Sequence, residues 1–226
     1  MTGILAKARA AGLSDSATRS IRGANRPESD SNTSIGEGPD TLPAFGDPEC
    51  ARFHHLFSGR EDIHARQWHH DGATGYSPVQ EPFTPAVARR HFTGACTVGV
   101  YPIRLDGTCT FLALDLDINK AAIGRAATDP AKARALREAL RETGLSILSR
   151  LRALSLSPLF EHSGYKGRHY WVFLGEPLPA EFLHGLGREI MAWLSPAIPP
   201  DFHLEFFPKQ AQATGKGLGN LIKLPL

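Results

Sequence analysis

The sequence predicts an α+β fold in which an antiparallel four-stranded sheet carries two helices on one face. Two segments, 130–155 and 179–194, carry apolar residues at the spacing of an amphipathic helix. Four others show the alternation or the short apolar runs that are typical of strands: 109–117, 157–163, 169–174 and 202–207. Their order is β-α-β-β-α-β, the arrangement of ferredoxin-like and RRM-like folds. In that arrangement the strands lie in the order 202–207, 109–117, 169–174, 157–163.

A small N-terminal α/β module and a disordered arm are expected ahead of this core. Residues 12–48 are rich in Ser, Gly, Asn, Asp and Pro, so 1–47 is predicted to be a disordered arm or linker. The ordered domain would span 48–226, divided into an N-terminal module (48–108) and the core (109–226). The module is predicted to contain, in order, a partly helical segment, a turn-rich loop, a short helix and a strand: 49–68, 71–79, 85–94 and 98–103.

Composition limits the classes of function. The chain has 226 residues, of which 42% are hydrophobic, and a formal net charge of +2. This charge excludes a polybasic nucleic-acid binder but allows a local basic groove. The three cysteines are widely spaced, which indicates reduced thiols in an intracellular protein. No apolar run approaches the roughly 20 residues that span a bilayer, and no signal peptide is evident, so we expect a cytoplasmic protein without membrane contact.

The period of two within strands brings acidic residues together. Asp115 and Asp117 share one face of the strand 109–117, opposite the face of its leucines. Because this strand is predicted to be central, its neighbours would add Glu205 on one side and His169 on the other. Three carboxylates and a histidine are therefore expected on one exposed face of the sheet.

This set of side chains predicts a metal site. Clustered carboxylates repel one another unless cations neutralise them, and oxygen ligands suit Mg²⁺ or Mn²⁺. Two such ions can promote attack by a hydroxyl on a phosphate. The neighbouring turn SGYKGRH offers backbone N–H groups, the Ser163 hydroxyl and the cations Lys166 and Arg168, which suit a triphosphate.

Simpler interpretations exist for each pattern. An Asp-x-Asp pair can lie at a solvated edge, a glycine-rich turn can be an ordinary hairpin, and the charged face of the first helix is expected to be solvated. Two other functions also remain open. One is a non-catalytic binding module for single-stranded nucleic acid that stacks bases on Trp171, Phe173 and Phe207, although three carboxylates there would repel phosphate. The other is a metal-dependent nuclease, which has no need for a triphosphate cradle.

The same residues resemble a known family. The motifs FLALDLD, SGYKGRHYWVF, LEFFPKQ and GLGNLIKLPL resemble, in this order, those of the archaeo-eukaryotic primase superfamily, above all the primase domains of TOTE conflict systems and CRISPR-associated primase-polymerases. The resemblance covers 53–226, because LFSGREDIHARQW and GYSPV are similar to that group's N-terminal module. It implies a primase-polymerase that uses nucleoside triphosphates and a single-stranded or primed DNA or RNA template. Helicases, nucleases or CRISPR proteins are the implied partners.

The resemblance also implies roles for individual residues. Asp115, Asp117 and Glu205 would be the catalytic metal ligands, and His169 would contact the phosphates of the incoming nucleotide. Ser163, Lys166 and Arg168 would contact the same phosphates. Nucleotide or template contacts are further implied for Lys209, Asn220 and Lys223.

The sequence departs from this family in two places. Many relatives have a compact Ser-x-His motif, whereas Gly167 holds the serine position here and Ser163 lies upstream. Relatives usually continue beyond GNLIKLPL, so a catalytic domain truncated at its C-terminus is expected.

Overall fold

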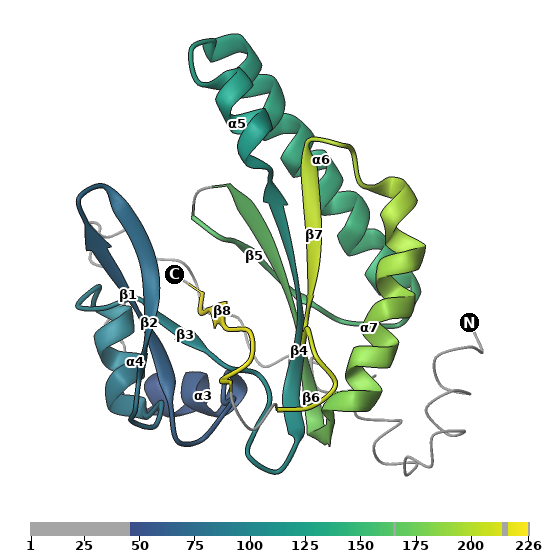
Figure 1. Cartoon of the computed structure of the whole chain (residues 1–226). Helices are drawn as coiled ribbons and strands as arrows, with labels where there is room; N and C mark the ends of the chain where they lie inside the picture. The colour runs from purple at the N-terminus through teal and green to yellow at the C-terminus, as the bar shows by residue number, and fades with distance from the viewer. Residues whose placement is uncertain (1–45, 165, 214–216, 226) are drawn as a thin grey trace, which may run out of the picture.

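The computed structural model describes residues 46–164, 166–213 and 217–225. Within them the chain forms two four-stranded antiparallel sheets, each with its own helices (Figure 1). The predicted disordered arm lies outside the described residues, except that the first described helix already begins at Asp47.

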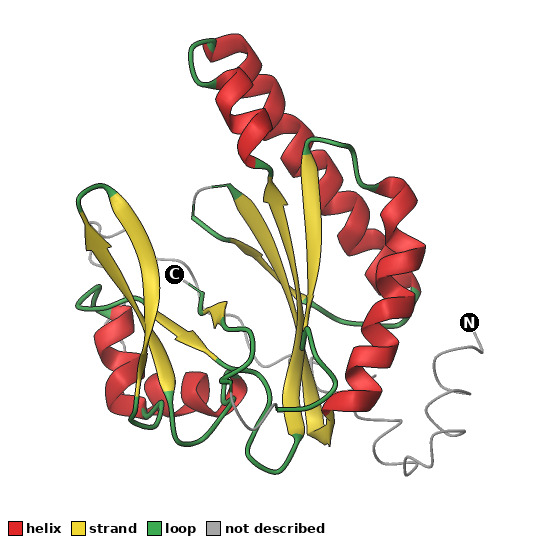
Figure 2. Cartoon of the chain, in the orientation of Figure 1, coloured by secondary structure: helices red, strands yellow, loops and turns green. Residues whose placement is uncertain are grey.

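The larger sheet has the predicted topology. Its strands lie in the order β5-β6-β4-β7, every neighbouring pair antiparallel. Helices α6 and α7 pack on one face, and a short helix, α5, and a 3-10 turn, η1, were not predicted (Figure 2). The elements are β4 (Thr108–Ile118), α5 (Lys120–Ala126), α6 (Pro130–Ala153), β5 (Leu159–His162), β6 (Gly167–Pro179), α7 (Ala180–Leu194), η1 (Ser195–Ala197) and β7 (Phe202–Phe207).

Local chemistry explains where the two long helices lie. The Asp129 side chain accepts hydrogen bonds from the backbone N–H groups of Ala131 and Lys132, which caps α6 at its start. In α7 a Cβ at Gly187 would lie 2.2 Å from the ring of Phe206, so only glycine lets the helix lie this close to β7. The apolar faces of both helices close a core over Leu112, Leu114 and the other helix-facing residues of the sheet. The alternation predicted for 109–117 is therefore confirmed.

The N-terminal module forms the smaller sheet, with strand order β2-β1-β3-β8. Its last strand comes from the C-terminal end of the described chain, so the two ends of the domain are joined in one sheet (Figure 1). The elements are α3 (Asp47–Leu56), β1 (His64–His70), β2 (Ala73–Val79), α4 (Pro85–Phe92), β3 (Val98–Val100) and β8 (Ile222–Lys223).

The prediction for 71–79 was wrong. Only Asp71 and Gly72, both with positive φ, form a turn, and Ala73–Val79 is a strand paired along its length with β1. Gly75 fits this strand because a Cβ there would lie 2.5 Å from the Trp68 ring, and Pro78 is tolerated because β2 is an edge strand. The partly helical segment 49–68 likewise divides into α3 and the start of β1.

The second face of the larger sheet is not open along its whole length, contrary to the prediction. Phe57, which follows α3, packs edge-on against Trp171 and Phe173, with ring centroids 4.9 Å and 5.0 Å apart. Trp171, Phe173 and Phe207 are only 0%, 5% and 3% exposed. Their rings are covered by the N-terminal module, so the binding module that would stack bases on them is not supported.

Two expectations from composition can also be compared with the structure. All three cysteines are free, as expected. Across the described ranges, no helix combines the length and apolar character needed to cross a membrane.

Candidate active site

The register of the larger sheet brings the predicted acidic residues together. Asp115 on the central strand β4 pairs with His169 of β6 on one side and with Glu205 of β7 on the other. Asp117 lies two residues further along the same face, opposite Gly167 and His203. Asp115, Asp117 and Glu205 are partly exposed, unlike the aromatic residues further along this face.

Asp115 lies in an environment that disfavours its charge. Its side chain is 20% exposed, and Oδ1 is buried without a hydrogen bond from any described residue. Burial raises the pKa of Asp115 to about 6, and the charges of Asp117 and Glu205 add to this effect. His169 and Lys166 oppose it but do not cancel it. A cation beside this carboxylate would therefore be bound favourably.

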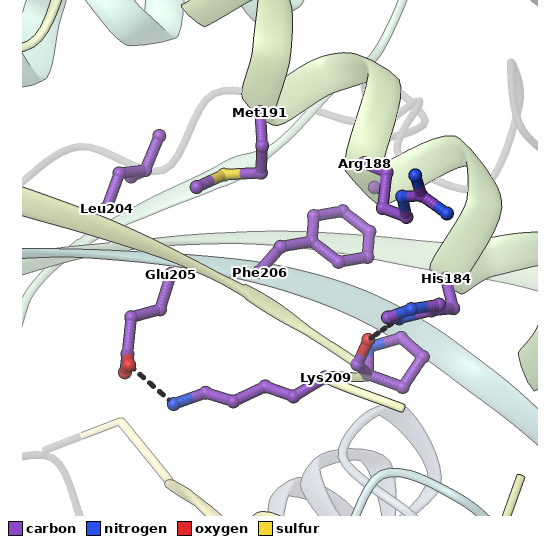
Figure 3. A pocket seen from close by; sticks show the side chains of 9 residues that line it. His184, Arg188, Met191, Leu204, Glu205, Phe206 and Lys209 are labelled. Carbon is purple, nitrogen blue, oxygen red and sulfur yellow. Dashed lines mark hydrogen bonds and ion pairs between the residues drawn. The ribbon is translucent and has the colours of Figure 1, made fainter. Parts of the chain in front are cut away.

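Lysines pair with the other two carboxylates. Lys166 from the β5–β6 turn forms an ion pair with Asp117. Lys209, just after β7, places its Nζ 2.6 Å from Glu205 Oε1 (Figure 3). In the described part, no group of three or more His, Cys, Asp or Glu side chains is arranged to hold a metal ion.

The donor chemistry nevertheless fits a divalent metal. Three carboxylates lie on adjacent strands, and one of their oxygens, Asp115 Oδ1, is buried without a hydrogen bond from any described residue. Oxygen donors of this kind are the ligands that Mg²⁺ and Mn²⁺ prefer. Asp115, Asp117 and Glu205 would be the ligands, once the two lysines released their carboxylates.

His169 is held from behind by Glu161, a residue outside the set of predicted site residues. The His169 ring is 4% exposed, and its Nδ1 donates to Glu161 Oε2 at 2.9 Å, while Nε2 lies 3.5 Å from Asp115 Oδ1. Burial lowers the pKa of His169, but the hydrogen bond to Glu161 and the charge of Asp115 outweigh it, so the pKa is raised. Glu161 pairs with His169 across β5 and β6. Alternation along the predicted strand 157–163 could have placed Glu161 on the same face of the sheet as His169.

The β5–β6 turn surrounds Asp117 closely. A Cβ at Gly167 would lie 2.3 Å from Asp117 Oδ1 and 2.9 Å from Ser163 Oγ. The Ser163 hydroxyl thus occupies the space beside position 167 where the relatives' serine would project. Lys223 of β8 donates to the Ser163 backbone carbonyl at 3.1 Å, which ties the N-terminal sheet to this turn.

Two residues that were predicted to contact the nucleotide or template, Arg168 and Asn220, do not lie at the carboxylates. Arg168 points to the helix face, because it alternates with His169; its Cγ would lie 3.3 Å from a Cβ at Gly144 of α6. Asn220 is exposed, and no hydrogen bond within the described ranges connects it with the acidic cluster.

A hollow of about 450 Å³ lies between α7 and the edge strand β7 (Figure 3). Glu205 and Lys209 lie at one side of it, so the hollow adjoins the acidic end of the sheet. It is lined by His184, Gly187, Arg188, Met191, Leu204, Glu205, Phe206, Pro208 and Lys209.

Two comparisons found proteins similar to this chain. Residues 49–226 match the family described as "TOTE conflict system, Archaeo-Eukaryotic Primase domain". Among solved structures, the chain is similar to the polymerase domain of Mycobacterium tuberculosis ligase D in complex with DNA, with 19% sequence identity and a TM-score of 0.34. That alignment covers 60% of this chain and 46% of the ligase D chain. No curated protein matches.

The family match spans both the N-terminal module and the whole acidic site. The chain therefore belongs to the archaeo-eukaryotic primase domains of TOTE conflict systems, a family of primase-type nucleotidyltransferases.

Proposed function

We propose that this chain is a template-directed nucleotidyltransferase, a primase-polymerase, that uses two divalent metal ions. One observation carries the proposal: Asp115, Asp117 and Glu205 meet, partly exposed, on one face of a sheet whose neighbouring aromatic surface on that face is buried. Membership of a primase family supports nucleotidyl transfer as the chemistry of this acidic site.

The proposed metals are Mg²⁺ or Mn²⁺, held by Asp115, Asp117 and Glu205. When bound, such ions would supply charge neutralisation and activate a hydroxyl for attack on the α-phosphate. The raised pKa of Asp115 supports this, because a carboxyl destabilised as an anion gains most from a neighbouring cation.

The chain's own cations suit the nucleotide. Lys166 and Lys209 are paired with Asp117 and Glu205, within reach of any phosphate held at those carboxylates. Ser163 and His169 lie on the β5–β6 side of the same end of the sheet. Positioning and charge neutralisation by these groups are the main contributions we assign to the protein. The proposed substrates are nucleoside triphosphates and a single-stranded or primed template.

A metal-dependent nuclease would use the same carboxylates. The lysines beside Asp117 and Glu205 favour the polymerase, because they suit a triphosphate, for which a nuclease has no need. Incorporation of nucleotides separates the two functions directly.

The test is incorporation of labelled nucleotides on a single-stranded template, with and without primer, in Mg²⁺ or Mn²⁺. The expected result is product that lengthens with time, and a loss on the order of 10³-fold in the Asp115→Asn, Asp117→Asn double variant. Asp71→Asn at the β1–β2 turn is the matched control, since it makes the same change at an exposed site outside the cluster.

Metal binding has its own readout. Mg²⁺ or Mn²⁺ should raise the unfolding temperature of the wild type and of Asp71→Asn but not of the double variant, because a ligand stabilises only the state that binds it. Template shortening in place of incorporation would support the nuclease. Neither activity, together with no metal-dependent stabilisation, would overturn the proposal.

A further inference from the structure

A buried carboxylate lies directly behind the histidine of the site. Glu161 Oε2 accepts two hydrogen bonds, from His169 Nδ1 at 2.9 Å and from Trp171 Nε1 at 2.7 Å. Both donors lie on β6, two residues apart. Together they fix the position of the carboxylate. His169 is left with one nitrogen, Nε2, and this atom faces Asp115.

Burying the carboxylate of Glu161 carries a desolvation cost. The Glu161 side chain is only 11% exposed, and its second oxygen, Oε1, is buried without a partner among the described residues. Removing a carboxylate from water without satisfying both oxygens is unfavourable. The favourable part of the arrangement is the pair of hydrogen bonds that the carboxylate accepts from His169 and Trp171.

We propose that Glu161 is a positioning residue, which fixes the His169 ring so that Nε2 faces the phosphates of a nucleotide bound at the Asp115 end of the site. The partner of one imidazole nitrogen determines where the other nitrogen points. The inference rests on the proposed function, because it assigns to His169 the contact with the incoming nucleotide. Glu161 itself does not touch the substrate.

The test is a double-mutant cycle in the nucleotide-incorporation assay. Glu161→Leu removes both hydrogen bonds, and we expect it to raise the nucleotide KM about 10- to 100-fold, the range seen for partners of functional histidines. Glu161→Gln can still accept both hydrogen bonds through its amide oxygen, so it should stay within a few-fold of the wild type. Glu142→Gln on the exposed surface of α6 is the control and should change nothing.

The cycle separates positioning from a structural role. If Glu161 acts through His169, Glu161→Leu should add no further loss in a His169→Ala background. A full additional loss in that background would overturn the inference, because it would show an effect independent of the histidine. A Glu161→Gln variant as impaired as Glu161→Leu would overturn it too, since charge and not placement would then matter.

Failure of the proposed function would give a different pattern. A wild type without incorporation, or a fully active His169→Ala variant, would overturn the proposed function or the role given to His169.

NMR of the ¹⁵N-histidine-labelled chain tests the orienting contact without activity. We expect an Nδ1–H signal of His169 that is protected from solvent in the wild type and Glu161→Gln but lost in Glu161→Leu. Its persistence in Glu161→Leu would overturn the inference whether or not the chain is an enzyme.

Discussion

The two ends of one sheet face differ in almost every physical respect. Strands β4, β6 and β7 contribute to both ends with the same alternation. At one end their side chains are aromatic or apolar and lie beneath Phe57 and the rest of the N-terminal module: Phe111, Ala113, Trp171, Phe173 and Phe207. At the other end the same strands carry Asp115, Asp117, Glu205 and His169, and the three carboxylates stay partly exposed. The candidate site thus begins where the aromatic cover ends.

The two ends also differ in what they contribute to stability. The covered end buries large rings that contact one another edge-on, which stabilises the fold. The open end gathers like charges and leaves an oxygen of Asp115 without a hydrogen bond. Functional sites commonly give up stability in this way. Removing the Phe57 ring should therefore lower stability, whereas neutralising Asp115 should raise it.

The largest effect is expected at the covered end. Phe57→Ala removes a ring that is 2% exposed and touches both Trp171 and Phe173, so we expect a loss of about 3–5 kcal/mol in the free energy of unfolding. Urea denaturation measures it. Leu105→Ala is the control, because Leu105 is 61% exposed and should change stability by less than about 0.5 kcal/mol. A loss at Phe57 no larger than at Leu105 would contradict the contact between the modules.

A smaller effect is expected where the turn meets Asp117. Gly167→Ser would restore the relatives' Ser-x-His spacing, but its Cβ would lie 2.3 Å from Asp117 Oδ1. We expect a loss of up to about 3 kcal/mol in stability, with reduced incorporation, because Asp117 must move. Gly185→Ser, at an α7 position where a Cβ meets nothing within 4 Å, is the matched control and should be nearly neutral. A stable and more active Gly167→Ser variant would show that Ser163 does not replace the missing hydroxyl.

The smallest effect depends on pH. The pKa of Asp115 is raised from 3.8 to about 6, chiefly by burial, so between these values the folded chain holds a proton that the unfolded chain has lost. The free energy of unfolding therefore falls as the pH rises through this window. In a metal-free buffer, Asp115→Asn should be more stable than the wild type by about 3 kcal/mol near pH 8 and nearly equal to it near pH 4.

Paired denaturation curves at the two pH values measure this difference, and groups that both proteins retain cancel to a first approximation. Asp71→Asn should show no such dependence, because Asp71 lies in an exposed turn. An Asp115→Asn variant that is less stable than the wild type near pH 8 would contradict the unfavourable burial of the charge.

Much of the core could be predicted from the sequence because alternation is a local property. The period of two placed Asp115 and Asp117 on the face opposite the leucines, and the order of elements gave the strand order that put Glu205 and His169 beside them. The same rule applied to two further residues would have shown that Glu161 faces His169 and that Arg168 points to the helices.

What covers the face could not be predicted in this way. The sequence contained the rings of Trp171 and Phe173, but their burial depends on Phe57, more than a hundred residues earlier in the chain. The ion pairs of Lys166 and Lys209 and the return of β8 to the N-terminal sheet likewise join distant segments. Alternation along a strand determines which face a side chain occupies, because it follows from backbone geometry alone. Only the packing of separate elements decides whether that face is buried or left open to a substrate.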